Sequence, residues 1–265
     1  ARVIEETCRS LGVPATVVEV NPGPVVTQFG LEPGYLERRD KNGSTQRTKV
    51  KVSRIAALAN DLALALAASP VRIEAPVPGK GVVGLEVPNA SPSMVGLRGV
   101  METPAFQKLP GTLRLALGRD VAGRPVVDDL HSLPHLLVAG ATGSGKSVCL
   151  SGIIASLLCQ NTPKQLRLIM IDPKRVELSA FSGIPHLAAP VIVEMERAVG
   201  VLQWVLNEMD RRYKLLARMG ARNIQAFNDL VRESPAEQLP YMVVIIDELA
   251  DLMLVSADAV EASIC

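Results

Sequence analysis

The sequence predicts an α/β fold with a mostly parallel sheet, preceded by a small α+β domain. Apolar residues make up 48% of the 265 residues but aromatic ones only 3%, so the core must consist of Val, Ile, Leu and Ala. That composition is typical of buried parallel strands. From residue 111 onward, apolar runs of strand length alternate with amphipathic stretches of helix length. One of these alternations contains the complete pattern G-x-x-x-x-G-K-S at residues 140–147.

Residues 1–100 are predicted to form the small α+β domain. A helix over 1–11 ends at Gly12, which favours the left-handed conformation that terminates helices. Strands over 14–20 and 25–32 follow, joined by a turn at 21–24. A second helix begins near Ser53, its expected N-cap, and strands over 71–75 and 82–87 repeat the helix–strand–strand order. One face of that helix carries the apolar residues Ile55, Leu58, Leu62 and Leu66.

A basic stretch interrupts this domain at residues 37–54. It contains Arg38, Arg39, Lys41, Arg47, Lys49, Lys51 and Arg54, with Glu37 and Asp40 as the acidic residues. A solvated loop is one interpretation, and a surface that meets DNA or another partner is the other. The net charge of the whole chain is +1, which by itself indicates no polyanionic partner.

Residues 101–265 are predicted to form the second domain. Seven prolines between 70 and 110 exclude long regular elements there and indicate a junction near 88–110. Strands are then expected at 113–117, 125–127, 135–139, 166–171 and 241–246. Helices are expected from the end of the glycine-rich pattern to 158, over 194–219 with a stop at Gly220, and over 223–233.

The glycine-rich pattern predicts a phosphate-binding loop for ATP. Its glycines allow the backbone N–H groups to approach phosphate oxygens closely, and the following helix adds the positive end of its dipole. Lys146 is expected to reach the β- and γ-phosphates, and the Ser147 hydroxyl to ligate Mg²⁺. The nucleotide-binding residues are predicted to be Gly140, Ala141, Thr142, Gly143, Ser144, Gly145, Lys146 and Ser147.

Two acids follow the apolar strand 241–246. The carboxyl ends of parallel strands are where ligands bind, so Asp247 is expected to hold Mg²⁺ through water. Glu248 is placed to polarise the attacking water, which makes Glu248 and Lys146 the predicted catalytic residues. A helix cap is the alternative explanation for such an acid pair. The turn 172–175, Asp-Pro-Lys-Arg, is predicted either to reach this site or a neighbour, or to be a surface turn.

Other features exclude several classes of protein. No apolar run reaches the roughly 18 residues of a membrane span. The four cysteines include no C-x-x-C pair and are expected to be reduced thiols in a cytosolic compartment. His131 and His135 have helical spacing, but Pro134 between them argues against a shared metal site.

The order of the motifs resembles that of RecA-like and AAA-like ATPases. Specific blocks are PHLLVAG (134–140), IDPKRVEL (171–178), GIPHL (183–187), MDRRYKL (209–215), LPY (239–241) and DELADLM (247–253). Upstream, the blocks are PGPVV (22–26) and VRIEAP (71–76). These blocks resemble the FtsK/SpoIIIE family of DNA translocases over nearly all of the chain. The resemblance implies a small α domain followed by the first part of a RecA-like motor domain.

The resemblance also implies a function. It predicts a hexameric ring ATPase that uses ATP and Mg²⁺ to move double-stranded DNA during chromosome segregation at cell division. The motor part is expected in the cytoplasm without membrane contact, and the full-length protein is expected to be anchored in the inner membrane at the division septum. The arginine given to the neighbouring subunit and the DNA-contacting pore loops are expected after Cys265. The basic stretch looks longer than the connection usual in the family.

Two other functions share these motifs. A ring ATPase for protein secretion or conjugation moves a different cargo with the same nucleotide chemistry. A nucleotide-binding switch module needs the loop but no water-activating carboxylate, so Glu248 argues against it. Stimulation of ATP hydrolysis by DNA distinguishes the translocase from both.

Overall fold

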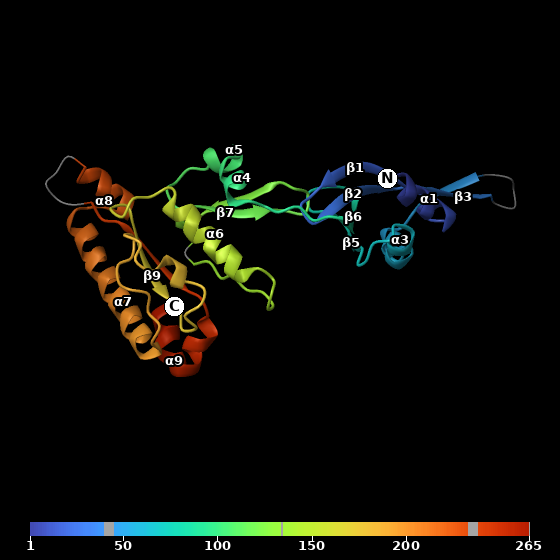
Figure 1. Cartoon of the computed structure of the whole chain (residues 1–265). Coiled ribbons are helices and arrows are strands. Elements are labelled where there is room, and N and C mark those ends of the chain that lie inside the picture. Colours follow the sequence, from blue (N-terminus) through green and yellow to red (C-terminus); the bar gives the residue numbers. More distant parts are fainter. Residues whose placement is uncertain (40–44, 134, 233–237, 265) are drawn as a thin grey trace. The chain divides into compact units, whose positions relative to one another are not determined.

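The computed structural model describes residues 1–39, 45–133, 135–232 and 238–264 (Figure 1). Asp40, Lys41, Pro134 and Cys265, and position 233 at the end of a predicted helix, lie outside this described part. The chain divides into two compact units, residues 1–108 with 116–127, and residues 109–115 with 128–265. The domain boundary after residue 100 remains a prediction.

The first unit contains a four-stranded antiparallel sheet in the order β1-β2-β6-β5. The strands are β1 (Ala15–Pro22), β2 (Val26–Pro33), β5 (Arg72–Glu74) and β6 (Val83–Pro88). All four strands were predicted from the sequence within about two residues. The second strand of each helix–strand–strand unit lies in the middle of the sheet, where β2 pairs with β6.

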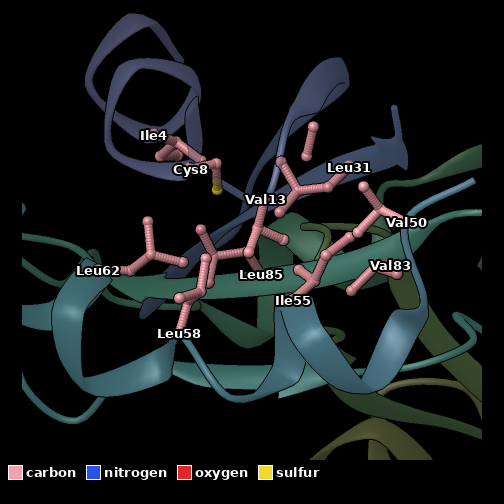
Figure 2. Close-up of a cluster of buried hydrophobic side chains, with 11 residues drawn as sticks. Ile4, Cys8, Val13, Leu31, Val50, Ile55, Leu58, Leu62, Val83 and Leu85 are labelled. Carbon is pink, nitrogen blue, oxygen red and sulfur yellow. The ribbon is translucent and has the colours of Figure 1, made fainter. Parts of the chain in front are cut away.

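Three helices of this unit contribute to one apolar core with the sheet (Figure 2). They are α1 (Arg2–Ser10), α2 (Val52–Ala56) and α3 (Ala59–Ala65), and α1 contacts both α3 and β1. Ile55, Leu58 and Leu62 are buried as their spacing predicted. The predicted single helix is instead two short ones, and Ser53 lies inside α2 rather than capping it. Lys51 occupies the cap position without a side-chain hydrogen bond.

Parts of the basic stretch form paired strands, so the loop interpretation is wrong for residues 37–39 and 45–49. Its strands are β3 (Tyr35–Arg39) and β4 (Thr45–Lys49), which pair antiparallel as a two-stranded sheet. Glu37 lies opposite Arg47, and their side chains form an ion pair at 2.7 Å. Pairs of opposite charge on facing residues stabilise a two-stranded sheet of this kind without alternating apolar residues. The search for apolar periodicity therefore did not predict these strands.

The proline-rich segment contains two short helices, α4 (Leu97–Met101) and α5 (Pro104–Gln107). Val100 and Phe106 of these helices are buried with Ala116 in a small separate cluster. The hairpin of β7 (Arg114–Arg119) and β8 (Pro125–Asp129) corresponds to the strands predicted at 113–117 and 125–127. It contributes residues to both units.

The second unit is organised on the parallel pair β9 (Leu166–Ile171) and β10 (Tyr241–Ile246), with the bounds predicted from the sequence. Ile169 and Ile171 of β9 share an apolar cluster with Ala198, Leu202 and Leu252. The helices are α6 (Lys146–Leu158), α7 (Met195–Arg218), α8 (Ile224–Leu230) and α9 (Leu249–Ile264), with 3-10 turns at Leu130–Ser132 and Ser179–Phe181. Figure 1 shows α7 beside α9, in agreement with their contacts.

The strand predicted at 135–139 is absent from the structure, in which these residues are irregular. Leu137 is 79% exposed and Leu136 is 39% exposed. A strand requires a neighbouring backbone to pair with its N–H and C=O groups. Within the described residues, β10 pairs with β9 alone. Residues 135–139 therefore have no neighbouring strand to pair with, although their composition is that of a buried strand. No helix in the described part of the chain has the length and apolar character needed to cross a bilayer.

Candidate functional site

The glycine-rich pattern forms an exposed loop that leads directly into α6. Gly143 has φ +79° and Gly145 has φ +98°, a region that favours glycine because a Cβ is strained there. Gly145 is the N-cap of α6, and Lys146 is its first residue. The first N–H groups of a helix have no intrahelical partners, and the helix dipole adds positive potential. The loop therefore presents a favourable environment for an anion at the start of α6.

Lys146 reaches the acids that follow β10. Its Nζ donates a hydrogen bond to the backbone oxygen of Asp247 at 2.9 Å. The same ammonium lies 3.5 Å from Asp247 Oδ1 and 3.4 Å from Glu248 Oε2. The structure thus brings together residues more than 100 positions apart in the sequence. Ser147 follows in the same turn of α6 and is partly buried.

Two aspartates lie at the carboxyl ends of the parallel strands. Asp172 follows β9 and Asp247 follows β10, where the Asp247 N–H continues the ladder to the Ile171 oxygen at 3.1 Å. Asp172 is fully buried, and its Oδ2 accepts a hydrogen bond from the Leu178 N–H at 2.9 Å. Within the described part of the chain, Oδ1 of Asp172 is buried without a hydrogen-bond partner, and the buried Oδ1 of Asp247 has the Lys146 ammonium 3.5 Å away as its polar neighbour. Such oxygens are available to a further donor or to the hydration shell of a cation.

Burial raises the pKa of the Asp247 carboxyl. The ammonium of Lys146 opposes this effect, and the nearby Asp172 adds to it. The site therefore contains acceptor oxygens and a cation in a setting that solvent screens only partly.

Glu248 lies between two lysines. Its pKa is lowered, first by the hydrogen bond from Lys146 and also by Lys174. Lys174 Nζ is 3.4 Å from Glu248 Oε2 and 3.6 Å from Asp251 Oδ2. The turn 172–175 thus reaches the site, which decides between the two interpretations of that turn.

Asp251 was not identified as a site residue from the sequence. It lies in the first turn of α9, an element that was not predicted. The spacing of Leu249, Leu252 and Met253 was the available signal, since apolar residues three and four apart indicate a helix. A helix there places Asp251 one turn beyond the acid pair.

Comparison with known families gives two matches that together span most of the chain. The FtsK alpha domain matches residues 1–89, and the FtsK/SpoIIIE family matches residues 96–265. The chain belongs to the FtsK/SpoIIIE family.

Curated members of the FtsK/SpoIIIE family are similar over the whole chain. The DNA translocase FtsK of Caldanaerobacter subterraneus subsp. tengcongensis is 49% identical over 98% of this chain and 35% of its own length. The DNA translocase SpoIIIE of Bacillus subtilis is 47% identical over 100% of this chain and 33% of its own length. The chain therefore spans about a third of the length of these relatives.

Solved structures confirm the α/β RecA-like class of this family member. The ATPγS-bound monomer of the pCW3 conjugation coupling protein TcpA has a TM-score of 0.50 at 23% identity, covering 99% of this chain and 69% of that protein. The cytoplasmic domain of the Thermomonospora curvata type VII secretion ATPase EccC has a TM-score of 0.50 at 24% identity, over 63% of this chain and 21% of its own. At these identities the likeness concerns the fold alone.

Proposed function

We propose that this chain is the ATP-binding part of a motor that moves double-stranded DNA. The observation that carries the proposal is the position of Lys146 at the start of α6, within 2.9 to 3.5 Å of oxygens of Asp247 and Glu248. A phosphate-binding loop beside a carboxylate pair at the ends of parallel strands is the arrangement that ATP hydrolysis requires. The named relatives are DNA translocases, which supports DNA as the cargo.

The loop residues are assigned to the phosphates of ATP. The backbone N–H groups of Gly140, Ala141, Thr142, Gly143, Ser144 and Gly145 and of the first turn of α6 would surround the phosphates. Lys146 would exchange its contacts with the two acids for the β- and γ-phosphates, which carry more negative charge. The left-handed φ of Gly143 and Gly145 supports this assignment, since it turns consecutive N–H groups towards one concave side.

Mg²⁺ fits the same residues. Apart from the Lys146 ammonium 3.5 Å away, the buried Oδ1 of Asp247 has no hydrogen-bond partner among the described residues, so a water of the metal shell would satisfy it. Ser147 would provide the hydroxyl ligand. When bound, Mg²⁺ neutralises charge on the phosphate oxygens.

Glu248 is assigned as the base that orients and deprotonates the attacking water. Lys146 and Lys174 lower the pKa of Glu248, so its carboxylate is ionised at neutral pH and can orient a water. A switch module that only binds nucleotide has no use for such a carboxylate. A secretion or conjugation motor shares the fold, but the likeness to such proteins at 23–24% identity adds no support for their cargo.

The remaining features of the proposal rest on family membership. A hexameric ring, an arginine from the adjoining subunit and attachment of the full-length protein at the division septum are expected of a DNA translocase of this family. The ring affects the rate of hydrolysis, because it lets one subunit supply an arginine to the site of its neighbour. Such an arginine raises the rate by a factor on the order of 10³–10⁵ in related enzymes.

The experiment that tests the proposal measures ATP hydrolysis by the full-length protein with and without long duplex DNA. We expect hydrolysis that depends on Mg²⁺ and rises at least severalfold with duplex DNA. Single-stranded DNA of equal length is the matched control for nonspecific electrostatic binding. Nucleotide binding without any hydrolysis would instead identify a switch module, and hydrolysis indifferent to duplex DNA would exclude the translocase.

A further inference from the structure

Lys174 connects two acids on the element that follows β10. Its Nζ lies 3.4 Å from Glu248 Oε2 and 3.6 Å from Asp251 Oδ2. Lys174 comes from the turn after β9, whereas Asp251 lies in the first turn of α9. The parallel pairing of β9 with β10 places these segments together although Lys174 and Glu248 are 74 positions apart. The lysine therefore contacts Glu248 from the opposite strand of the pair.

The turn that carries Lys174 is fixed from within the fold. Asp172 is fully buried, and its Oδ2 accepts the Leu178 N–H at 2.9 Å. The Arg175 N–H donates to the backbone oxygen of Asp172 at 3.2 Å. These bonds close the turn on both sides of Lys174, which limits the positions available to its ammonium.

Two ammonium groups share the same oxygen of Glu248. Lys146 and Lys174 each lie 3.4 Å from Oε2. Phosphates of a bound nucleotide compete for Lys146, because that lysine belongs to the phosphate loop. Lys174 is held in addition by Asp251, which lies outside the loop. Among the described residues, departure of Lys146 therefore leaves Lys174 as the cationic partner of Glu248.

We propose that Lys174, held by Asp251, is a positioning residue that orients the Glu248 carboxylate once nucleotide has engaged Lys146. This inference rests on the proposed function of Glu248. The ammonium acts through Glu248 and not on the phosphates. Its loss leaves the base free to rotate, and a misplacement of about 1 Å can cost on the order of 10²-fold in rate.

A structural role predicts different behaviour. Lys174 is 53% exposed, and exposed ion pairs contribute about 1 kcal/mol or less to stability. Removal of the lysine should therefore leave the melting temperature nearly unchanged while the hydrolysis rate falls. Lys164 provides a matched control, because it is exposed and precedes the amino end of β9, whereas Lys174 follows the carboxyl end.

The test compares Lys174→Met, Lys174→Arg and Lys164→Met in the full-length protein. For Lys174→Met we expect kcat to fall about 10- to 100-fold, with KM and the Kd of a non-hydrolysable ATP analogue within about twofold of the unmodified protein. Lys174→Arg should recover most of the rate, because a guanidinium reaches both acids. Lys164→Met should change none of these quantities.

A double-substitution cycle locates the effect. In a Glu248→Gln background, Lys174→Met should reduce kcat by no more than about twofold further, because the lysine acts through a carboxylate that is already absent. Additive losses in the cycle would overturn the inference.

Two other results would also overturn it. A tenfold rise in the analogue Kd of Lys174→Met would place the lysine on the phosphates, and an unchanged kcat would make it a surface residue. Absence of hydrolysis by the unmodified protein would refute the proposed function and this inference together. An active unmodified protein with an equally active Lys174→Met variant would refute this inference alone.

Discussion

Glu208 of helix α7 holds an arginine that hydrogen-bonds to the residue before strand β10. Its carboxylate accepts hydrogen bonds from Arg211 Nε at 2.6 Å and from Arg212 Nε at 2.7 Å. Arg212 also donates to the backbone oxygen of Pro240 at 2.7 Å, one residue before β10. Substitution of Glu208 by Gln keeps the size of the side chain and removes the charge that orients both arginines.

The magnitude follows from the pKa of this carboxyl. The hydrogen bond from Arg211 is the largest cause that lowers the pKa of Glu208 from 4.5 to about 2, and Arg212 adds to it against the opposing effect of burial. A difference of this size corresponds to about 3 kcal/mol. Glu208 is 14% exposed but Arg211 is 58% exposed, so solvent screening reduces the expected loss for Glu208→Gln to about 1–2 kcal/mol.

The effect has a defined pH dependence. Because the pKa of Glu208 is lower in the folded state, its stabilisation is fully present above the ordinary pKa of 4.5. It is lost as the pH falls from about 4.5 towards about 2. The stability difference between the unmodified protein and Glu208→Gln should therefore be constant from pH 7 to 5.5 and shrink towards pH 3.

Trp204 provides the assay, since it is the single tryptophan of the sequence and lies on α7 one turn before Glu208. Urea unfolding followed by its fluorescence reports the free energy of unfolding of this part of the chain. Asp210→Asn is the control on the same helix, because Asp210 and its partner Lys214 are both more than 60% exposed. That control should lose less than about 0.5 kcal/mol. Equal losses for the two variants, or a difference as large at pH 3 as at pH 7, would refute the reasoning.

Three further outcomes are expected. Lys146→Ala should weaken ATP binding at least tenfold in a calorimetric titration, because a charged donor to the phosphates is lost. Lys164→Ala should bind ATP with the affinity of the unmodified protein. If Lys146→Ala bound ATP within about twofold of the unmodified protein, Lys146 would not belong to the phosphate site. Glu248→Gln should bind Mg-ATP with nearly unchanged affinity and hydrolyse it about 10²- to 10⁴-fold more slowly, and an unchanged rate would make Glu248 a structural acid. Leu252→Ala, on the buried face of α9, should lower the free energy of unfolding by about 2–5 kcal/mol. Leu254→Ala, at a position 86% exposed, should change it by less than about 0.5 kcal/mol, and similar losses for the two variants would contradict the observed packing.

Much of the secondary structure followed from local patterns. β9 and β10 begin and end where their apolar runs predicted, and α7 ends before Gly220, which has φ +65°. Asn223 caps α8 by accepting a hydrogen bond from the Ala226 N–H at 2.8 Å. Each of these features depends on residues within a few positions of one another, so the sequence contains the necessary information.

Two predictions failed because strands depend on partners elsewhere in the chain. Residues 135–139 have the composition of a buried strand but no ladder partner among the described residues. The polar segments Tyr35–Arg39 and Thr45–Lys49 lack apolar alternation but pair with each other. In both cases the pairing of backbone groups decided the outcome, and side-chain periodicity did not.

The sequence by itself predicted a phosphate loop, Lys146 and the acid pair as site residues, because these residues stand in short contiguous patterns whose chemistry is set by type and spacing. Only the tertiary structure decided that the turn after β9 belongs to the site. Parallel pairing aligns the carboxyl ends of β9 and β10, and this brings Lys174 to Glu248 and Asp251. No local pattern specifies such a contact, because it depends on which strands become neighbours and in which register.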